Sequence, residues 1–117
     1  MVAMRVILKF FLLFYIVCTS LYAKESKDIL LIHSYHKGYQ WSDDISKVIE
    51  HQFSEKHNIF LSTIYMDTKR IDTDTYLDEF YHYYKKRFDG TRFDLIIVAD
   101  NSALTFAKSH YEELFKD

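Results

Sequence analysis

Three short, mostly apolar runs recur along the chain, and each is followed by a polar stretch with helical spacing. The runs cover residues 29–34, 59–66 and 93–99, and they are rich in β-branched residues. A run that is continuously apolar, rather than alternating, is typical of a strand covered on both faces, as in a parallel sheet. The pattern therefore predicts three buried parallel strands.

A helix is expected after each strand. In the first helix Ser42 is the expected N-cap, and Asp43 and Asp44 complement the positive end of the helix dipole. The residues expected on the apolar face of this helix are Ile45, Val48, Ile49 and Phe53.

The second helix carries an aromatic stripe. Thr73 or Asp72 is its expected N-cap, and Gly90 ends it by supplying a left-handed turn. The aromatic residues recur every four positions, which places them on one buried face. They are Tyr76, Phe80, Tyr84 and Phe88.

The third helix completes a regular alternation of strands and helices. Asp100, Asn101 or Ser102 is its expected N-cap. Its expected inner face consists of Leu104, Ala107, Tyr111 and Leu114. The order β-α-β-α-β-α implies right-handed crossovers, and it predicts an α/β fold with three α-β-α layers around a parallel sheet. Such sheets usually have more than three strands, so we expect residues 24–117 to be the first, incomplete part of a lobe.

The first 23 residues have the pattern of a secretory signal. Arg5 and Lys9 form a basic start, and residues 10–17 are an unbroken apolar run. A basic region before a short apolar region is typical of a signal peptide, with Ala23 as the expected last residue before cleavage. An uncleaved N-terminal membrane anchor is the alternative. Both interpretations place the rest of the chain outside the cytoplasm, either in the periplasm or held at the inner membrane.

Composition restricts what the exported part can do. The single cysteine, Cys18, lies in the signal segment, and the bulky residues before it argue against lipidation, so no disulfide is expected beyond it. The formal net charge is −2 at pH 7, which argues against nucleic acid as a partner. Without proline and with 2 glycines, the chain has no evident linker. The membrane is expected as a partner only through the N-terminal segment.

Candidate chemistry lies in the three loops that follow the strands, at residues 33–41, 67–70 and 100–102. In a parallel sheet these loops share one rim, where small ligands bind. Aromatic faces, both signs of charge and a helix N-terminus suit a small polar organic ligand, for example an amino acid. The expected ligand-binding residues are Ser34, Tyr35, Tyr39, Trp41, Asp67, Arg70, Asp100, Asn101 and Ser102. The alternative is structural, with these residues serving as helix caps, packing or solvated turns.

No motif supports an enzyme. The nucleophile motif G-x-S-x-G and the glycine-rich phosphate loops are absent from the sequence. His33 and His36 lack an evident third ligand, so no metal is expected. No cofactor is expected either. Any kinase or cyclase activity would reside in a domain beyond this chain.

Four segments in order resemble a known family. They are 29–43 (ILLIHSYHKGYQWSD), 65–70 (YMDTKR), 76–77 (YL) and 93–104 (FDLIIVADNSAL). They resemble the ABC-transporter substrate-binding-like domains, which are similar to type I periplasmic binding proteins. Such domains often form the extracytoplasmic sensors of bacterial histidine kinases, in two-component systems, and of diguanylate cyclases.

The resemblance implies two lobes that close on a small ligand, of which this chain would hold the first part of the first lobe. It implies a ligand-sensing domain fragment of a membrane signal-transduction protein, whose partners are a second lobe and an output domain. The alternative is the periplasmic substrate-binding protein of an ABC importer, with a permease as its partner. A receiver-like domain is disfavoured because the first strand ends in His33 and Ser34 instead of paired aspartates.

Overall fold

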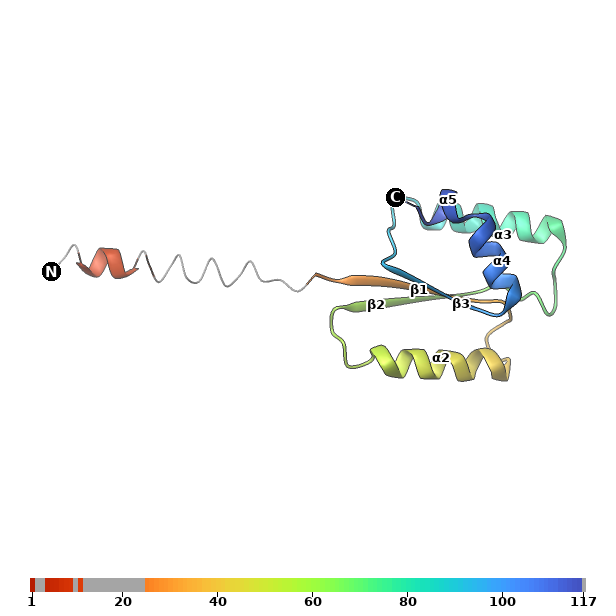
Figure 1. The fold of residues 1–117 in the computed structure, drawn as a ribbon, viewed down its shortest axis with the longest axis horizontal. Coiled ribbons are helices and arrows are strands. Elements are labelled where there is room, and N and C mark those ends of the chain that lie inside the picture. Colours follow the sequence, from red (N-terminus) through yellow and green to blue (C-terminus); the bar gives the residue numbers. More distant parts are fainter. Residues whose placement is uncertain (2–3, 10, 12–24, 117) are drawn as a thin grey trace.

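The computed structural model describes residues 1, 4–9, 11 and 25–116. Most of the predicted signal segment therefore lies outside the described residues, although residues 4–9 are helical. Within the described part, no helix is long and apolar enough to span a membrane. The remaining elements, drawn in Figure 1, are β1 (Lys27–His33), α2 (Gln40–Phe53), β2 (Ile59–Tyr65), α3 (Asp74–Arg87), β3 (Leu95–Ala99), α4 (Asn101–Ser109) and α5 (Tyr111–Leu114).

The strands form a parallel sheet in the order β2-β1-β3. Helix α2 covers one face, and α3, α4 and α5 lie on the other (Figure 1). This arrangement confirms the predicted α/β fold with helices on both sides of a parallel sheet. His33 at the end of β1 is opposite Tyr65 and Ala99. The carboxyl ends of the strands therefore meet at one edge of the sheet, and the following loops start there.

The core is aromatic on the side of α3 and α4. Leu30 and Ile32 of β1 are fully buried and belong to the same cluster as Phe80 and Phe106. The predicted stripe of α3 is confirmed by consecutive ring contacts, with centroids 6.2, 4.5 and 5.3 Å apart from Tyr76 to Phe88. The expected end signals are also in place. Thr73 is the N-cap of α3 and accepts a hydrogen bond from the Tyr76 N–H, and Gly90 has a φ of +72°.

Helix α2 differs from the prediction in its start and its inner face. It begins at Gln40, because the Asp43 carboxylate accepts the Gly38 N–H at 2.9 Å and closes the turn before the helix. Ser42 is therefore an interior position, buried against the sheet together with Ser46. Val48, expected on the inner face, is 62% exposed.

Helix α4 also has a different inner face. Ala103 and Phe106 are buried, whereas Leu104 and Tyr111 are 45% and 52% exposed. The cause is a contact distant in sequence, because the Ala103 N–H donates to Ser34 Oγ at 2.8 Å and fixes how the helix is rotated on the sheet. Helix α4 also ends at Ser109, so Tyr111 belongs to a separate short helix, α5.

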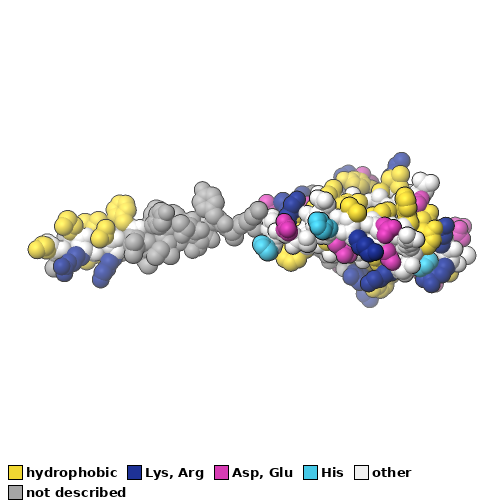
Figure 2. Space-filling view, turned by 90° about the horizontal axis from the view of Figure 1, so that it is seen from below, with side chains coloured by type: hydrophobic (Ala, Val, Ile, Leu, Met, Phe, Trp, Pro, Cys, Tyr) yellow, Lys and Arg dark blue, Asp and Glu magenta, His cyan; other side chains and the backbone are white. Residues whose placement is uncertain are grey.

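Apolar side chains are consequently left on the surface. Leu104 and Tyr111 line an open apolar hollow with Ile96 and Val98 of β3. Figure 2 shows hydrophobic side chains gathered on the face of the molecule seen from below, the side on which α2 lies. Exposed apolar residues thus include Trp41 and Val48 on α2 and Leu95, Leu104 and Tyr111 in and after β3.

The assignment of the α4 inner face predicts unequal costs for two neighbouring truncations. We expect Phe106→Ala to lower the free energy of unfolding by about 3–5 kcal/mol, because it leaves a cavity against Phe80. Leu104→Ala should cost about 1 kcal/mol or less, since Leu104 is already half exposed. Urea unfolding followed by circular dichroism measures both. Equal losses would contradict the assignment.

Candidate functional site

The three loops at the carboxyl edge are held together by backbone hydrogen bonds. The Ser34 N–H donates to the Ala99 carbonyl at 3.1 Å, and the Thr68 N–H donates to the Ser34 carbonyl at 2.8 Å. Met66 N–H likewise donates to the His33 carbonyl at 2.8 Å. Each loop is therefore fixed at its first residues, while the side chains that follow extend from the sheet edge.

Ser34 lies at the centre of these contacts. Its hydroxyl donates to the Ala99 carbonyl at 2.8 Å and accepts the Ala103 N–H at 2.8 Å. Thr68 Oγ1 donates to its carbonyl at 2.7 Å. The residue is only 1% exposed, so the polar groups expected to bind a ligand are used inside the protein. The arrangement gives Ser34 a structural role at the rim.

Four side chains from the three loops form a cluster that we call the tyrosine cage, consisting of Tyr35, Tyr39, Lys69 and Asp100. The tyrosine rings meet edge to face, with centroids 5.2 Å apart. The Lys69 ammonium nitrogen lies 5.1 and 5.0 Å from the centroids of Tyr35 and Tyr39. Both distances fall within the range of cation–π attraction. The predicted convergence of the loops thus holds for Tyr35, Tyr39 and Asp100.

The electrostatics of the tyrosine cage follow from these contacts. The Asp100 carboxylate interacts with the Tyr35 hydroxyl and raises the pKa of that phenol. The Tyr39 hydroxyl in turn raises the pKa of the Lys69 ammonium, with smaller contributions from Tyr35 and Asp100. Asp100 has a φ of +78° and also accepts the Asn101 N–H at 2.7 Å as the N-cap of α4. The cage therefore contains one cation, held over two rings, and one carboxylate that contributes to the field at that cation.

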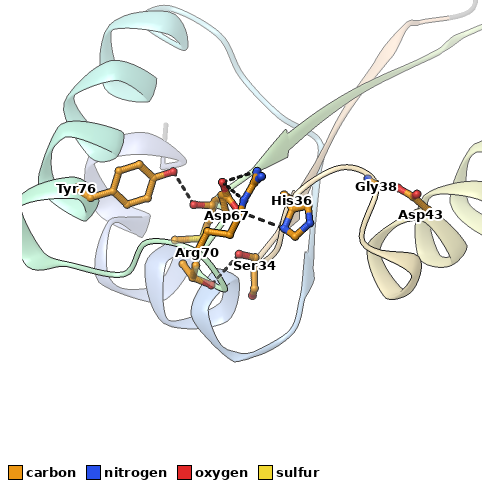
Figure 3. A network of polar contacts seen from close by, with 9 residues as sticks. Ser34, His36, Gly38, Asp43, Asp67, Arg70 and Tyr76 are labelled. Carbon is orange, nitrogen blue, oxygen red and sulfur yellow. Dashed lines mark hydrogen bonds and ion pairs between the residues drawn. The ribbon is translucent and has the colours of Figure 1, made fainter.

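A second cluster on the rim consists of Asp67, Arg70 and His36 (Figure 3). Arg70 Nε lies 2.7 and 2.9 Å from the two Asp67 carboxylate oxygens, and Arg70 Nη2 lies 2.7 Å from Oδ2. His36 Nδ1 is 3.2 Å from Asp67 Oδ1. The Arg70 guanidinium holds the pKa of Asp67 below its usual value. The two charges expected to bind separate ligand groups therefore bind each other.

Asn101 and Ser102 line a hollow beside the rim, between the loop after β2 and helix α4. It measures about 380 Å³. Its lining combines the apolar side chains of Met66, Leu77 and Phe106 with polar ones that include Thr68 and Asp72. Most of the residues around this hollow are polar, so it offers hydrogen-bonding groups beside an apolar surface.

Trp41 lies apart from these residues. It is 57% exposed in the first turn of α2. There it lines a shallow apolar hollow together with Ile45 and Val48 of the same helix. The reason is the early start of α2, which places residue 41 on the helix and not in the loop.

His33 forms a buried polar contact that the sequence pattern did not indicate. Its Nε2 lies 2.9 Å from Ser46 Oγ, and its ring stacks on Tyr65 with centroids 5.0 Å apart. No described atom pairs with its buried Nδ1. Burial lowers the pKa of His33, and the Asp43 carboxylate opposes this shift. His33 and His36 therefore have different polar partners, Ser46 and Asp67. Among the described residues, no group of three His, Cys, Asp or Glu side chains is placed to hold a metal.

Comparisons of the sequence and the structure with protein-family models, curated proteins and solved structures found no match.

We expect Ser34→Ala to destabilise the protein strongly, because it leaves the buried Ala103 N–H without its acceptor and the Ala99 carbonyl without one donor. Each buried group left unpaired costs about 1–3 kcal/mol. Ser54→Ala is the matched control, since that hydroxyl donates to the His51 carbonyl at the exposed end of α2. Urea unfolding of both variants should show a loss of about 0.5 kcal/mol or less for the control. Similar midpoints would contradict the role of Ser34.

The buried His33 predicts an acid-sensitive fold. Its pKa is lower in the folded than in the unfolded chain, so unfolding takes up a proton below the ordinary value of about 6.5. The contribution of His33 to the free energy of unfolding should therefore be constant above that pH and fall as the pH is lowered through it. His33→Gln should reduce this dependence, leaving a remainder from His110, whose pKa is also lowered by burial. Denaturation at pH 7.5 and pH 5 measures it, and an unchanged slope would refute the assignment.

Proposed function

We propose that this chain is the ligand-binding part of an extracytoplasmic sensor domain that belongs to a bacterial membrane signal-transduction protein. The observation that carries the proposal is the tyrosine cage, in which Tyr35, Lys69 and Asp100 come from three different loops and meet at the carboxyl edge of a parallel sheet. This edge is where open α/β sheets bind small molecules. The basic and apolar N-terminal sequence supports export, and the resemblance of residues 29–43 to sensor domains supports signalling.

The ligand we propose is a small polar organic molecule, for example an amino acid. Aromatic faces at Tyr35 and Tyr39 would cover an apolar or cationic part, and the hollow lined by Asn101 and Ser102 offers polar and apolar side chains next to the rim. A second lobe that closes over the rim would complete the site. Closure around a ligand is the usual way in which two-lobed binding domains transmit a signal. An output domain beyond this chain would receive it across the membrane.

Binding is tested with a screen of amino acids and small amines, added to the full chain in a mild detergent. Trp41 is the single tryptophan, and it lies two residues after Tyr39, so its fluorescence reports changes at the start of α2. We expect at least one compound to change this fluorescence saturably. Asp100→Asn should weaken that binding about tenfold or more, the usual effect of losing a charged hydrogen-bond partner.

Asp78→Asn is the control, since Asp78 is an exposed carboxylate on α3 that pairs with His82. It should bind as the unaltered chain does. The proposal fails if no compound in the screen binds, or if the two variants weaken binding equally.

A further inference from the structure

The tyrosine cage already contains an organic cation, which is the ammonium group of Lys69. Its nitrogen lies 5.1 and 5.0 Å from two ring centroids that belong to a different loop. The Asp100 carboxylate, from the third loop, contributes to the field at this ammonium. Lys69 itself is exposed. An exposed side chain thus places its ammonium group over two aromatic rings, in the field of a carboxylate.

We propose that the cage of Tyr35, Tyr39 and Asp100 recognises the cationic group of a small organic ligand, a primary or quaternary ammonium, and that Lys69 holds this place until the ligand displaces it. The inference rests on the proposed function and names the ligand class of the same site.

The chemistry of the three groups favours a cation. The faces of tyrosine rings are negative and attract cations within about 6 Å of their centroids. Asp100 supplies a full negative charge, and departure of Lys69 leaves that charge without its neighbouring ammonium. Lysine is a flexible side chain with a strongly hydrated head, so it leaves an exposed site readily. A quaternary ammonium is less hydrated and gains more from the rings.

The surroundings disfavour the opposite interpretation, in which Lys69 is a ligand for an anion. An anion in contact with its ammonium would lie beside the Asp100 carboxylate and two negative ring faces. The neighbouring cation, Arg70, is engaged by both oxygens of Asp67 (Figure 3). An incoming carboxylate would therefore not find two unpaired cations in the loop that carries Lys69 and Arg70.

The test compares choline with its neutral isostere 3,3-dimethylbutan-1-ol and with acetate, each titrated into the full chain by isothermal calorimetry. We expect choline to bind and the neutral isostere to bind at least tenfold more weakly. Lys69→Met removes the competing cation but keeps the length of the side chain, and it should tighten choline binding by about tenfold. Lys69→Gln should also tighten it, which guards against a folding defect in one variant.

Loss of a ring should have the opposite effect. Tyr35→Leu and Tyr39→Leu should each weaken choline binding by tenfold or more. The matched controls are Tyr83→Leu, at an exposed tyrosine of α3, and Lys47→Met, at an exposed lysine of α2. Both controls should bind choline as the unaltered chain does.

Three results would overturn the inference. Equal binding of choline and the isostere would show that charge is not recognised. Binding of acetate that is lost in Lys69→Met would make Lys69 an anion ligand, and the proposed function would survive with another ligand class. Absence of binding by choline, acetate and every compound of the amino-acid and amine screen would overturn both proposals.

Discussion

The geometry of the rim depends on the hydroxyl group of Ser34. It joins the end of β1 to the end of β3 and to the first turn of α4 through two hydrogen bonds of 2.8 Å. Buried backbone groups need partners, and here one side chain supplies a partner to two of them. The same residue's carbonyl receives Thr68 from the loop after β2. The three loops that carry the candidate ligand-binding residues are therefore all positioned by hydrogen bonds to one buried serine.

The charged groups of the rim have partners within the rim. Asp67 is held by Arg70, and Lys69 lies between the rings of Tyr35 and Tyr39 near Asp100. Exposed pairs of this kind contribute little to stability. Under the proposed function they would set the selectivity of the surface instead, because an incoming ligand would have to exchange partners with groups that already have one. A ligand of the wrong charge gains nothing from such an exchange.

Sequence patterns predicted the elements and failed where distant contacts decide orientation. The continuous apolar runs were sufficient to predict the parallel strands, and Thr73 and Gly90 have the roles that local chemistry assigned to them. The predicted inner faces of α2 and α4 were wrong at Val48 and Leu104, which are exposed. For α4, the rotation is set by Ser34, 69 positions before Ala103. No spacing rule along the chain encodes such a contact.

The candidate site shows the same limit. Tyr35, Tyr39 and Asp100 were predicted from their places at strand ends, since parallel strands bring those ends together. The central position of Lys69 depends on how far its side chain reaches toward another loop. Trp41 was misplaced because a glycine turn at Gly38, closed by Asp43, starts α2 earlier than the Ser42 cap would.

The two faces of the sheet differ in how they are held, and this difference links the site to the fold. The face under α3 and α4 is a hydrophobic cluster that includes Phe80, Phe88 and Phe106. The face under α2 contains the buried hydroxyls of Ser42 and Ser46, and the buried Ser42 hydroxyl has no partner among the described residues. The buried residues of α2 are both serines, and elements with few buried apolar residues open first in local unfolding, so we expect α2 to be the weaker layer.

Tyr39 connects this weaker layer to the tyrosine cage. It is the N-cap residue of α2, without a side-chain cap of its own, and its ring faces Lys69. A ligand that binds Tyr39 only in the folded arrangement stabilises the first turn of α2 by mass action. Under the proposed function, a ligand bound in the cage would therefore stabilise α2, which is one layer of the domain, against local unfolding. That coupling needs no movement of the aromatic core.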